Sequence, residues 1–199
     1  MGISMSEFKS NFTIVGEIGE ILVNILKESF LNCNDFVQKI TQITIGSPDI
    51  EETPKNNVKP QIVLFLYHLD KNAHFEYPED NYSKLALELY YLVIAVANEK
   101  AIEHKMIGRV AETFNANKVL YLNNEKYKDM HGFIGGGHDI KVNIASMTID
   151  DRHKLWTGFP KLADKTFIPY IVRPVIITCE PPGSEERVRE REFNILDKM

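Results

Sequence analysis

A chain of 199 residues with 44% hydrophobic and 26% charged residues has the size and composition of one globular domain with its own core. Its formal net charge of −5, without any run of lysines and arginines, argues against a nucleic-acid partner, because such binding depends on basic side chains that neutralise phosphates. The two cysteines are too few for a disulfide framework or a zinc knuckle, and they indicate buried thiols in a reducing compartment.

We also expect synthesis and assembly in the cytoplasm, without a membrane partner. Residues 1–12 lack the basic segment and the following apolar segment of a secretory signal. The longest strongly apolar stretch, Leu85–Ala97, contains Glu88 and is too short to span a bilayer.

The first element in chain order is an amphipathic helix over Glu17–Phe30. Its apolar residues recur at helical spacing and form a single core-facing stripe. The glycine-containing segment 16–19 is no dinucleotide-binding fingerprint, because it follows no clear strand and lacks a third glycine. Residues 43–45 then indicate a short strand, and the polar, proline-marked segment 51–60 predicts a loop.

Two strong strand patterns follow. Gln61–Leu69 is apolar on both faces until His68, which is typical of a central strand covered on both sides. Lys84–Asn98 alternates with a period of two and is rich in aromatic and branched residues, which predicts a second strand. One face of this second strand carries Glu88 and Tyr90 among apolar residues.

A second helix is predicted over Glu99–Asn115, because its apolar residues lie four positions apart. Asn98 suits its N-cap, and Asn115 or Asn117 suits its end. The stretch 117–138 ends in three consecutive glycines, which are costly to order. We therefore expect a long loop there that is mobile or is ordered by a partner.

The chain then alternates between strand and helix. Asp139–Met147 shows the alternation of a strand. Thr148 and Asp151 have the spacing of a capping box, which predicts a short helix over Ile149–Phe159. The side chains expected on its inward face are Leu155 and Trp156.

The final strand is predicted over Thr166–Cys179. It contains Pro169 and Pro174, and two prolines in one strand point to a sheet edge or a bulge. Together the elements predict a single α/β (α+β) domain over residues 1–182. Its sheet is expected to be mixed, largely antiparallel and flanked by two to three helices.

Residues 183–199 are expected to form a charged C-terminal arm. Alternating glutamates and arginines lead into a small apolar end. A disordered charged terminus is the default for such a composition, whereas a solvating linker that ends in an apolar anchor suits docking onto a neighbour. Both interpretations stay open. The candidate partner-contact residues are Arg187, Arg189, Phe193, Ile195 and Leu196.

Residues that could carry chemistry are few. His131 and His138 flank the glycine run, but no third ligand is fixed beside them, so we interpret them as surface-loop histidines. Asp150, Asp151 and His153 resemble an acid–base cluster, yet negative charge is favoured at a helix start, and capping explains both carboxylates. We therefore predict no catalytic, cofactor-binding or metal-binding residue.

Two blocks of the sequence resemble the tail-terminator, or cap, family of phage-tail-like contractile injection systems. In the first, Leu85–Leu92 reads leucine-alanine-leucine-acidic-leucine-aromatic-tyrosine-leucine and is followed by a helix that holds Ile107 and Gly108. In the second, Thr148–Trp156 is an acidic-leading helix that ends in leucine-tryptophan and precedes a final strand. The resemblance extends over roughly residues 15–180, and the arm lies outside both blocks.

The resemblance implies a structural protein without catalytic activity. Such caps form six-membered rings on the end of the inner tube and the last sheath ring, where they stop polymerisation and hold the sheath extended. The implied partners are other copies of this chain, the inner tube protein and the sheath protein, in a particle that is released or anchored. Two alternatives stay open: a monomeric protein-binding adaptor, and a small metal-dependent hydrolase that uses His131, His138 or His153.

Overall fold

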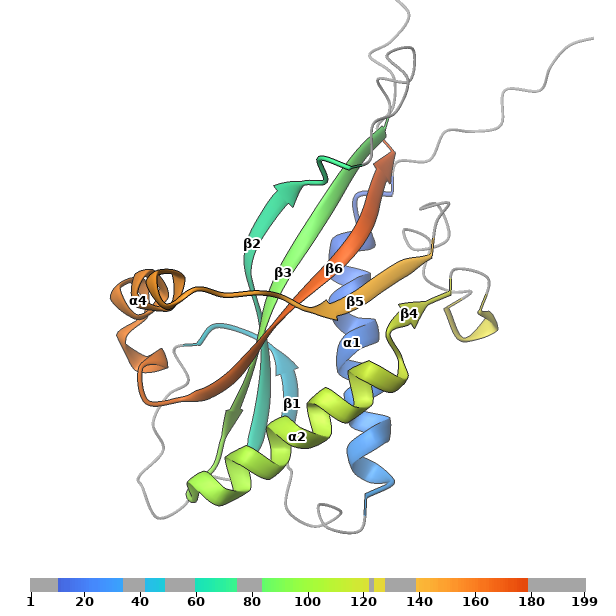
Figure 1. Cartoon of the computed structure of the whole chain (residues 1–199). Helices are drawn as coiled ribbons and strands as arrows, with labels where there is room; N and C mark the ends of the chain where they lie inside the picture. The colour runs from blue at the N-terminus through green and yellow to red at the C-terminus, as the bar shows by residue number, and fades with distance from the viewer. Residues whose placement is uncertain are drawn as a thin grey trace, which may run out of the picture.

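The computed structural model describes residues 11–33, 42–48, 60–74, 84–121, 124–127 and 139–178 (Figure 1). These residues form a six-stranded sheet and three α-helices, which confirms the predicted α+β class. Only β1 and β2 pair in parallel, and the other pairs are antiparallel. The elements are α1 (Ile14–Leu31), β1 (Gln42–Ile45), β2 (Gln61–Lys71), β3 (Lys84–Val96), α2 (Lys100–Ala116), β4 (Val119–Leu120), η1 (Glu125–Tyr127), β5 (Ile140–Ile144), α4 (Ile149–Gly158), η2 (Pro160–Leu162) and β6 (Thr166–Thr178).

The strand order β1-β2-β3-β6-β5-β4 places β6 inside the sheet. The expectation that its prolines mark a sheet edge is therefore wrong. Pro169 directs its carbonyl toward the β5 side, where it accepts a hydrogen bond of 3.0 Å from the Ala145 amide just past the end of β5. Because both polar groups of a strand residue point to the same side, the N–H that Pro169 lacks is not needed by β3.

The alternative expectation, a bulge, is confirmed at Pro174. The register of β3 and β6 passes from Leu87 opposite Val175 to Leu89 opposite Val172. Two residues of β6 therefore face the single Glu88 of β3. A bulge leaves one residue out of the ladder, so a proline is tolerated there.

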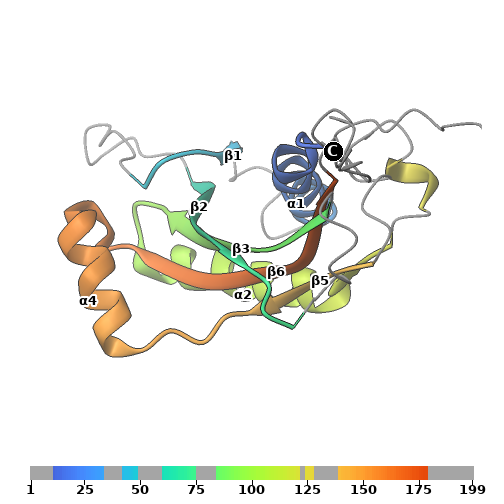
Figure 2. The ribbon, with the colours of Figure 1, turned by 90° about the horizontal axis from the view of Figure 1, so that it is seen from above.

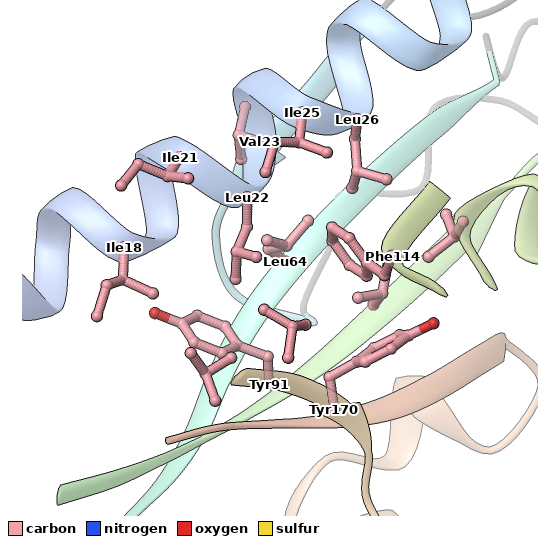
Figure 3. Close-up of a cluster of buried hydrophobic side chains, with 14 of the residues drawn as sticks. Ile18, Ile21, Leu22, Val23, Ile25, Leu26, Leu64, Tyr91, Phe114 and Tyr170 are labelled. Atoms are coloured by element: carbon pink, nitrogen blue, oxygen red, sulfur yellow. The ribbon is translucent and has the colours of Figure 1, made fainter. Parts of the chain in front are cut away.

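One face of the sheet is covered by α1 and α2, whose apolar side chains share one core cluster. The stripe predicted for the first helix is confirmed, although α1 begins at Ile14 and not at Glu17. Figure 3 shows Leu22 and Leu26 of α1 directed toward Leu64 on β2. A Cβ at Gly19 would lie 2.8 Å from Ile45 Cδ1, the end of a half-exposed side chain, so a larger residue there would require the Ile45 side chain to shift.

The opposite face carries a second, smaller cluster at one end of the sheet, under α4 and η2 (Figure 2). Leu155 and Trp156 of α4 pack against it, as predicted from the sequence. The buried members of this cluster are Leu92, Ile94, Val96 and Leu162. The helices α1 and α4 therefore lie on opposite sides of the sheet, and α4 covers only part of its face.

Several predicted boundaries differ in detail. The N-cap of α2 is Glu99 and not Asn98, while Asn117 ends the helix as expected. The strand β2 is buried on both faces only over Ile62–Leu64, and it is exposed from His68 onward because neither β1 nor α4 extends that far. Within the predicted loop 117–138, the described part holds β4 and η1. None of the described helices is long and apolar enough to cross a membrane.

Candidate functional site

The candidate contact residues of the arm lie outside the described residues: Arg187, Arg189, Phe193, Ile195 and Leu196. The same holds for Cys179 and for the two histidines that flank the glycine run, His131 and His138. Within the described ranges, no three His, Cys, Asp or Glu residues group together so as to hold a metal ion.

The acidic residues at the start of α4 serve the helix. Thr148 Oγ1 accepts a hydrogen bond of 3.1 Å from the Asp151 amide, and Asp151 Oδ2 accepts bonds of 3.1 Å and 2.7 Å from the Thr148 amide and hydroxyl. Asp150 forms an exposed ion pair of 2.6 Å with Lys154. The His153 ring lies edge-on to Trp156, with 5.2 Å between centroids. The capping interpretation is confirmed for Asp151, whereas Asp150 lies in the first turn and pairs with Lys154.

The capping box of α4 leads to a testable prediction about the pKa of Asp151. Hydrogen bonds from the Thr148 side chain and backbone hold the pKa of Asp151 below its usual range. A lowered pKa means that the charged carboxylate stabilises the helix above the unfolded-state pKa, and that this contribution is lost as the pH falls through the folded-state pKa. Thr148→Ala should raise the pKa of Asp151 toward its usual range in an NMR titration of the carboxyl group. Thr157→Ala should leave it unchanged, because Thr157 donates to the His153 carbonyl instead.

A buried carboxylate, Glu88, lies on the same sheet face as α4, in the part that α4 does not cover. It was not identified from the sequence as part of a site. Glu88 is only 7% exposed. Its Oε1 accepts a bond of 2.7 Å from Arg173 Nη1, and its Oε2 accepts one of 2.8 Å from the Tyr90 hydroxyl. The bulge in β6 sets Arg173 beside Glu88. Both carboxylate oxygens are thus occupied, and the group is neither a free base nor a free nucleophile.

Aromatic rings surround this ion pair. Tyr67 lies edge-on to Tyr90, with 6.2 Å between ring centroids. The His68 ring is tilted against the Tyr90 ring, with 5.3 Å between their centroids. Desolvation, the Glu88 hydrogen bond and nearby carboxylates raise the pKa of Tyr90 to about 12. The phenol therefore stays protonated at neutral pH and keeps donating to Glu88. Half-exposed tyrosines beside an arginine are the composition that protein–protein interfaces favour.

A groove of about 360 Å³ lies between the C-terminal ends of α1 and α2. Arg109 crosses it, donating to the Ser29 carbonyl at 2.9 Å and pairing with Glu112 at 2.8 Å. Lys126 of η1 pairs with Glu28 of α1 at 2.6 Å. The groove's charged side chains thus have partners of opposite sign, so the groove offers no evident selectivity for a charged ligand.

The edges of the sheet are poorly suited to accept another strand. The edge strands β1 and β4 have only four and two residues. Because β1 pairs only as far as Leu64, no strand of the described residues pairs with this edge of β2 from Phe65 to Lys71. A bulge between Leu66 and His68 and the exposed charge of Asp70 interrupt that edge.

The end of β6 extends beyond β5, and Asn11 closes its free edge. Asn11 Nδ2 donates to the Ile176 carbonyl at 2.9 Å, and its Oδ1 accepts from the Thr178 amide at 2.6 Å. The side-chain amide thereby takes the place of a peptide group of a neighbouring strand. The described part of the chain therefore favours contact through its faces over strand addition.

The sequence pattern of the Pvc16 N-terminal domain family matches residues 17–191. The chain belongs to this family. The match includes all six strands and extends into the C-terminal arm. A search of curated proteins finds no match.

Two solved structures resemble this Pvc16 N-terminal domain. The PVC sheath/tube terminator of an extracellular contractile injection system, in its extended state, aligns with a TM-score of 0.55 and 11% identity over 92% of this chain and 65% of that chain. The anti-feeding prophage cap, an AFP tube-terminating cap, aligns with a TM-score of 0.49 and 12% identity over 88% of this chain and 59% of that chain. The chain thus spans less than two thirds of either protein. The resemblance drawn from the sequence is confirmed for the family and the fold.

Proposed function

We propose that this chain is the structural cap of a contractile injection particle. Six copies form a ring on the end of the inner tube and the last sheath ring, where the ring ends polymerisation and holds the sheath extended. The cap carries out no catalysis and needs no cofactor. Its partners are other copies of the chain, the inner tube protein and the sheath protein.

The family match over residues 17–191 is the observation that carries this proposal. The fold shared with the PVC sheath/tube terminator supports it, at a TM-score of 0.55 over 92% of this chain. A ring on a six-fold tube lets every subunit make the same contact through a closed head-to-tail interface. Many modest contacts then add up to stable capping without any single tight site.

The direct test compares particles assembled with and without this chain. We expect particles without it to have a broad distribution of tube lengths and to contract spontaneously, as measured by negative-stain electron microscopy. Supplying the chain in trans should restore uniform, extended particles. Uniform and extended particles in its absence would contradict the cap function.

The arm gives a second prediction. Deleting residues 183–199 should weaken binding to particles while the thermal unfolding temperature of the domain stays unchanged, because the arm is expected to lie outside the domain of residues 1–182. Replacing Phe193, Ile195 and Leu196 with serine tests the apolar end, and changing Arg187 and Arg189 to glutamine tests the charged part. If the truncated protein caps particles as well as the full chain, the arm makes no partner contact.

The two alternatives differ from the cap in simple solution properties. A monomeric adaptor keeps the mass of one chain in light scattering, both alone and mixed with tube protein, whereas a cap reaches the mass of a hexamer in at least one condition. A hydrolase that uses His131, His138 or His153 contains stoichiometric metal in elemental analysis. Either result would move the function away from the cap.

A further inference from the structure

We propose that the ring closes by packing the solvent-facing side of α1 in one copy against the sheet face around Tyr90 in the next copy. This inference rests on the proposed cap function, which requires a ring but does not say which surfaces meet. The α1 surface comprises Phe12, Gly16, Glu20, Asn24, Lys27 and Leu31. The Tyr90 surface comprises Tyr67, His68, Tyr90, Lys141, Asn143 and Arg173.

The two surfaces face in opposite directions. The apolar stripe of α1 packs on the sheet, so its exposed side points away from the sheet. The Tyr90 surface lies on the other sheet face, beside the region that α4 covers, because Tyr67 packs both on the cluster under α4 and against Tyr90. Two different surfaces on opposite sides of one layer make a head-to-tail contact, which gives a closed ring when the rotation between successive copies divides a full turn. A two-fold dimer would instead pair like with like.

The α1 surface has an exposed apolar side chain near each end: Phe12, just before the helix, and Leu31, its last residue. Phe12 is 72% exposed and Leu31 is 69% exposed. Between them, a Cβ at Gly16 would have no neighbour within 4 Å, and Asn24 is exposed. A neighbouring copy packed along this side of α1 would remove both apolar side chains from water.

The Tyr90 surface has complementary chemistry. It presents half-buried tyrosine rings and the Arg173 guanidinium, whose side chain remains 42% exposed although it pairs with Glu88. Tyrosine and arginine are enriched among the side chains that contribute most of the binding energy at interfaces. The charges are also complementary: within the described residues, Glu20 on α1 and Lys141 on β5 are exposed and have no ion pair of their own. Each would find an opposite charge across the interface.

The α1 surface also carries Lys27, and β2 carries Asp70 at the margin of the Tyr90 surface. Each surface therefore carries charges of both signs, so two pairs of opposite charge can form across the interface: Glu20 with Lys141, and Lys27 with Asp70. The edge strands are short and the longer free edges are bulged or closed, so face-to-face packing is the route that the described residues leave open.

The first test maps the contact between copies. Benzoylphenylalanine is introduced at Asn143, and equal amounts of ¹⁵N-labelled and unlabelled full-length protein are mixed in the condition in which light scattering gives the hexamer mass, and are then irradiated and digested. We expect cross-links between copies that join residue 143 to peptides from 12–31. Cross-links only between two Tyr90 surfaces, only to other segments, or between no copies at all would overturn the interface.

The second test blocks the contact without touching the core. Asn24→Arg places a long side chain in the centre of the α1 surface and should lower the oligomer fraction in light scattering at least tenfold. Asn115→Arg is the matched control, since Asn115 is also an exposed helical asparagine, on α2, and it should leave the fraction unchanged. Equal effects of the two variants would contradict the proposal.

Exchanging the charges of Glu20 and Lys141 tests whether these two side chains meet across the interface. Glu20→Lys and Lys141→Glu should each weaken association two- to fivefold per interface, and the double variant should recover most of the loss. No recovery would place Glu20 and Lys141 in separate contacts and would overturn the assignment.

The particle assay separates this inference from the cap function. Failure of the cross-links with capping intact rejects only the interface, whereas normal particles without the chain reject the cap.

Discussion

Replacing Phe114 with alanine should lower the free energy of unfolding by about 3–5 kcal/mol. Phe114 is 1% exposed and lies on α2, where its ring meets Tyr170 of β6 edge-on with 4.9 Å between centroids. Truncation removes the apolar surface that joins helix to sheet and leaves a cavity that rigid strands on one side cannot collapse into (Figure 3). Urea denaturation followed by circular dichroism measures the change.

Phe12 supplies the matched control. It is 72% exposed, so Phe12→Ala should change the free energy of unfolding by less than about 0.5 kcal/mol. The same substitution at Phe12 nevertheless removes an apolar end of the α1 surface and should weaken association between copies. Similar stability losses in the two variants would mean that Phe114 does not hold α2 on the sheet.

The elements with a strong local signal were predictable from the sequence. The stripe of α1 and the alternation of β3 follow from periodicity alone, because burial on one face imposes the period of the element. The capping box of α4 is equally local, since Thr148 and Asp151 satisfy each other within one turn. These features need no knowledge of the rest of the chain.

The place of β6 in the sheet was not predictable in this way. Proline is excluded from a ladder only where its missing N–H is needed, and that depends on which neighbour each residue faces. Pro169 faces the side where β5 has just ended, and Pro174 sits in a bulge opposite Glu88. Both facts come from strand pairing, which the sequence around the prolines does not reveal.

The residues that form the candidate surfaces could be recognised only in part from the sequence. A carboxylate at Glu88 inside an apolar strand is a clear signal, but its partner Arg173 is 85 residues away. Asn11 is farther still from the β6 edge that it closes, 165 residues from Ile176. Pairwise contacts at such separations are fixed by topology, so the sequence pointed to candidate contact residues only in the arm and not to the surface around Tyr90.

A buried carboxylate near the start of α2 provides the other large expected effect. Glu103 is 2% exposed and accepts bonds of 2.8 Å from Lys100 Nζ, 2.8 Å from the Thr166 hydroxyl and 3.3 Å from the Ala97 amide. It thereby joins the first turn of α2 to the end of β3 and the start of β6. Glu103→Ala should lower the free energy of unfolding by about 3 kcal/mol, because the part-buried Ala97 amide and Thr166 hydroxyl lose their acceptor.

The matched control on the same helix is Glu112→Ala. The Glu112 side chain is 69% exposed and pairs with Arg109, so its loss should cost about 0–1 kcal/mol, in keeping with a surface ion pair. Glu103→Gln keeps one carbonyl acceptor and should fall between the two. Thermal unfolding at low and high salt distinguishes the causes: the Glu112 effect should fade with salt, while the Glu103 effect should persist because it arises from unsatisfied donors. A Glu103→Ala variant as stable as Glu112→Ala would mean that water replaces the carboxylate, and that the β3–α2–β6 junction is held by its apolar contacts alone.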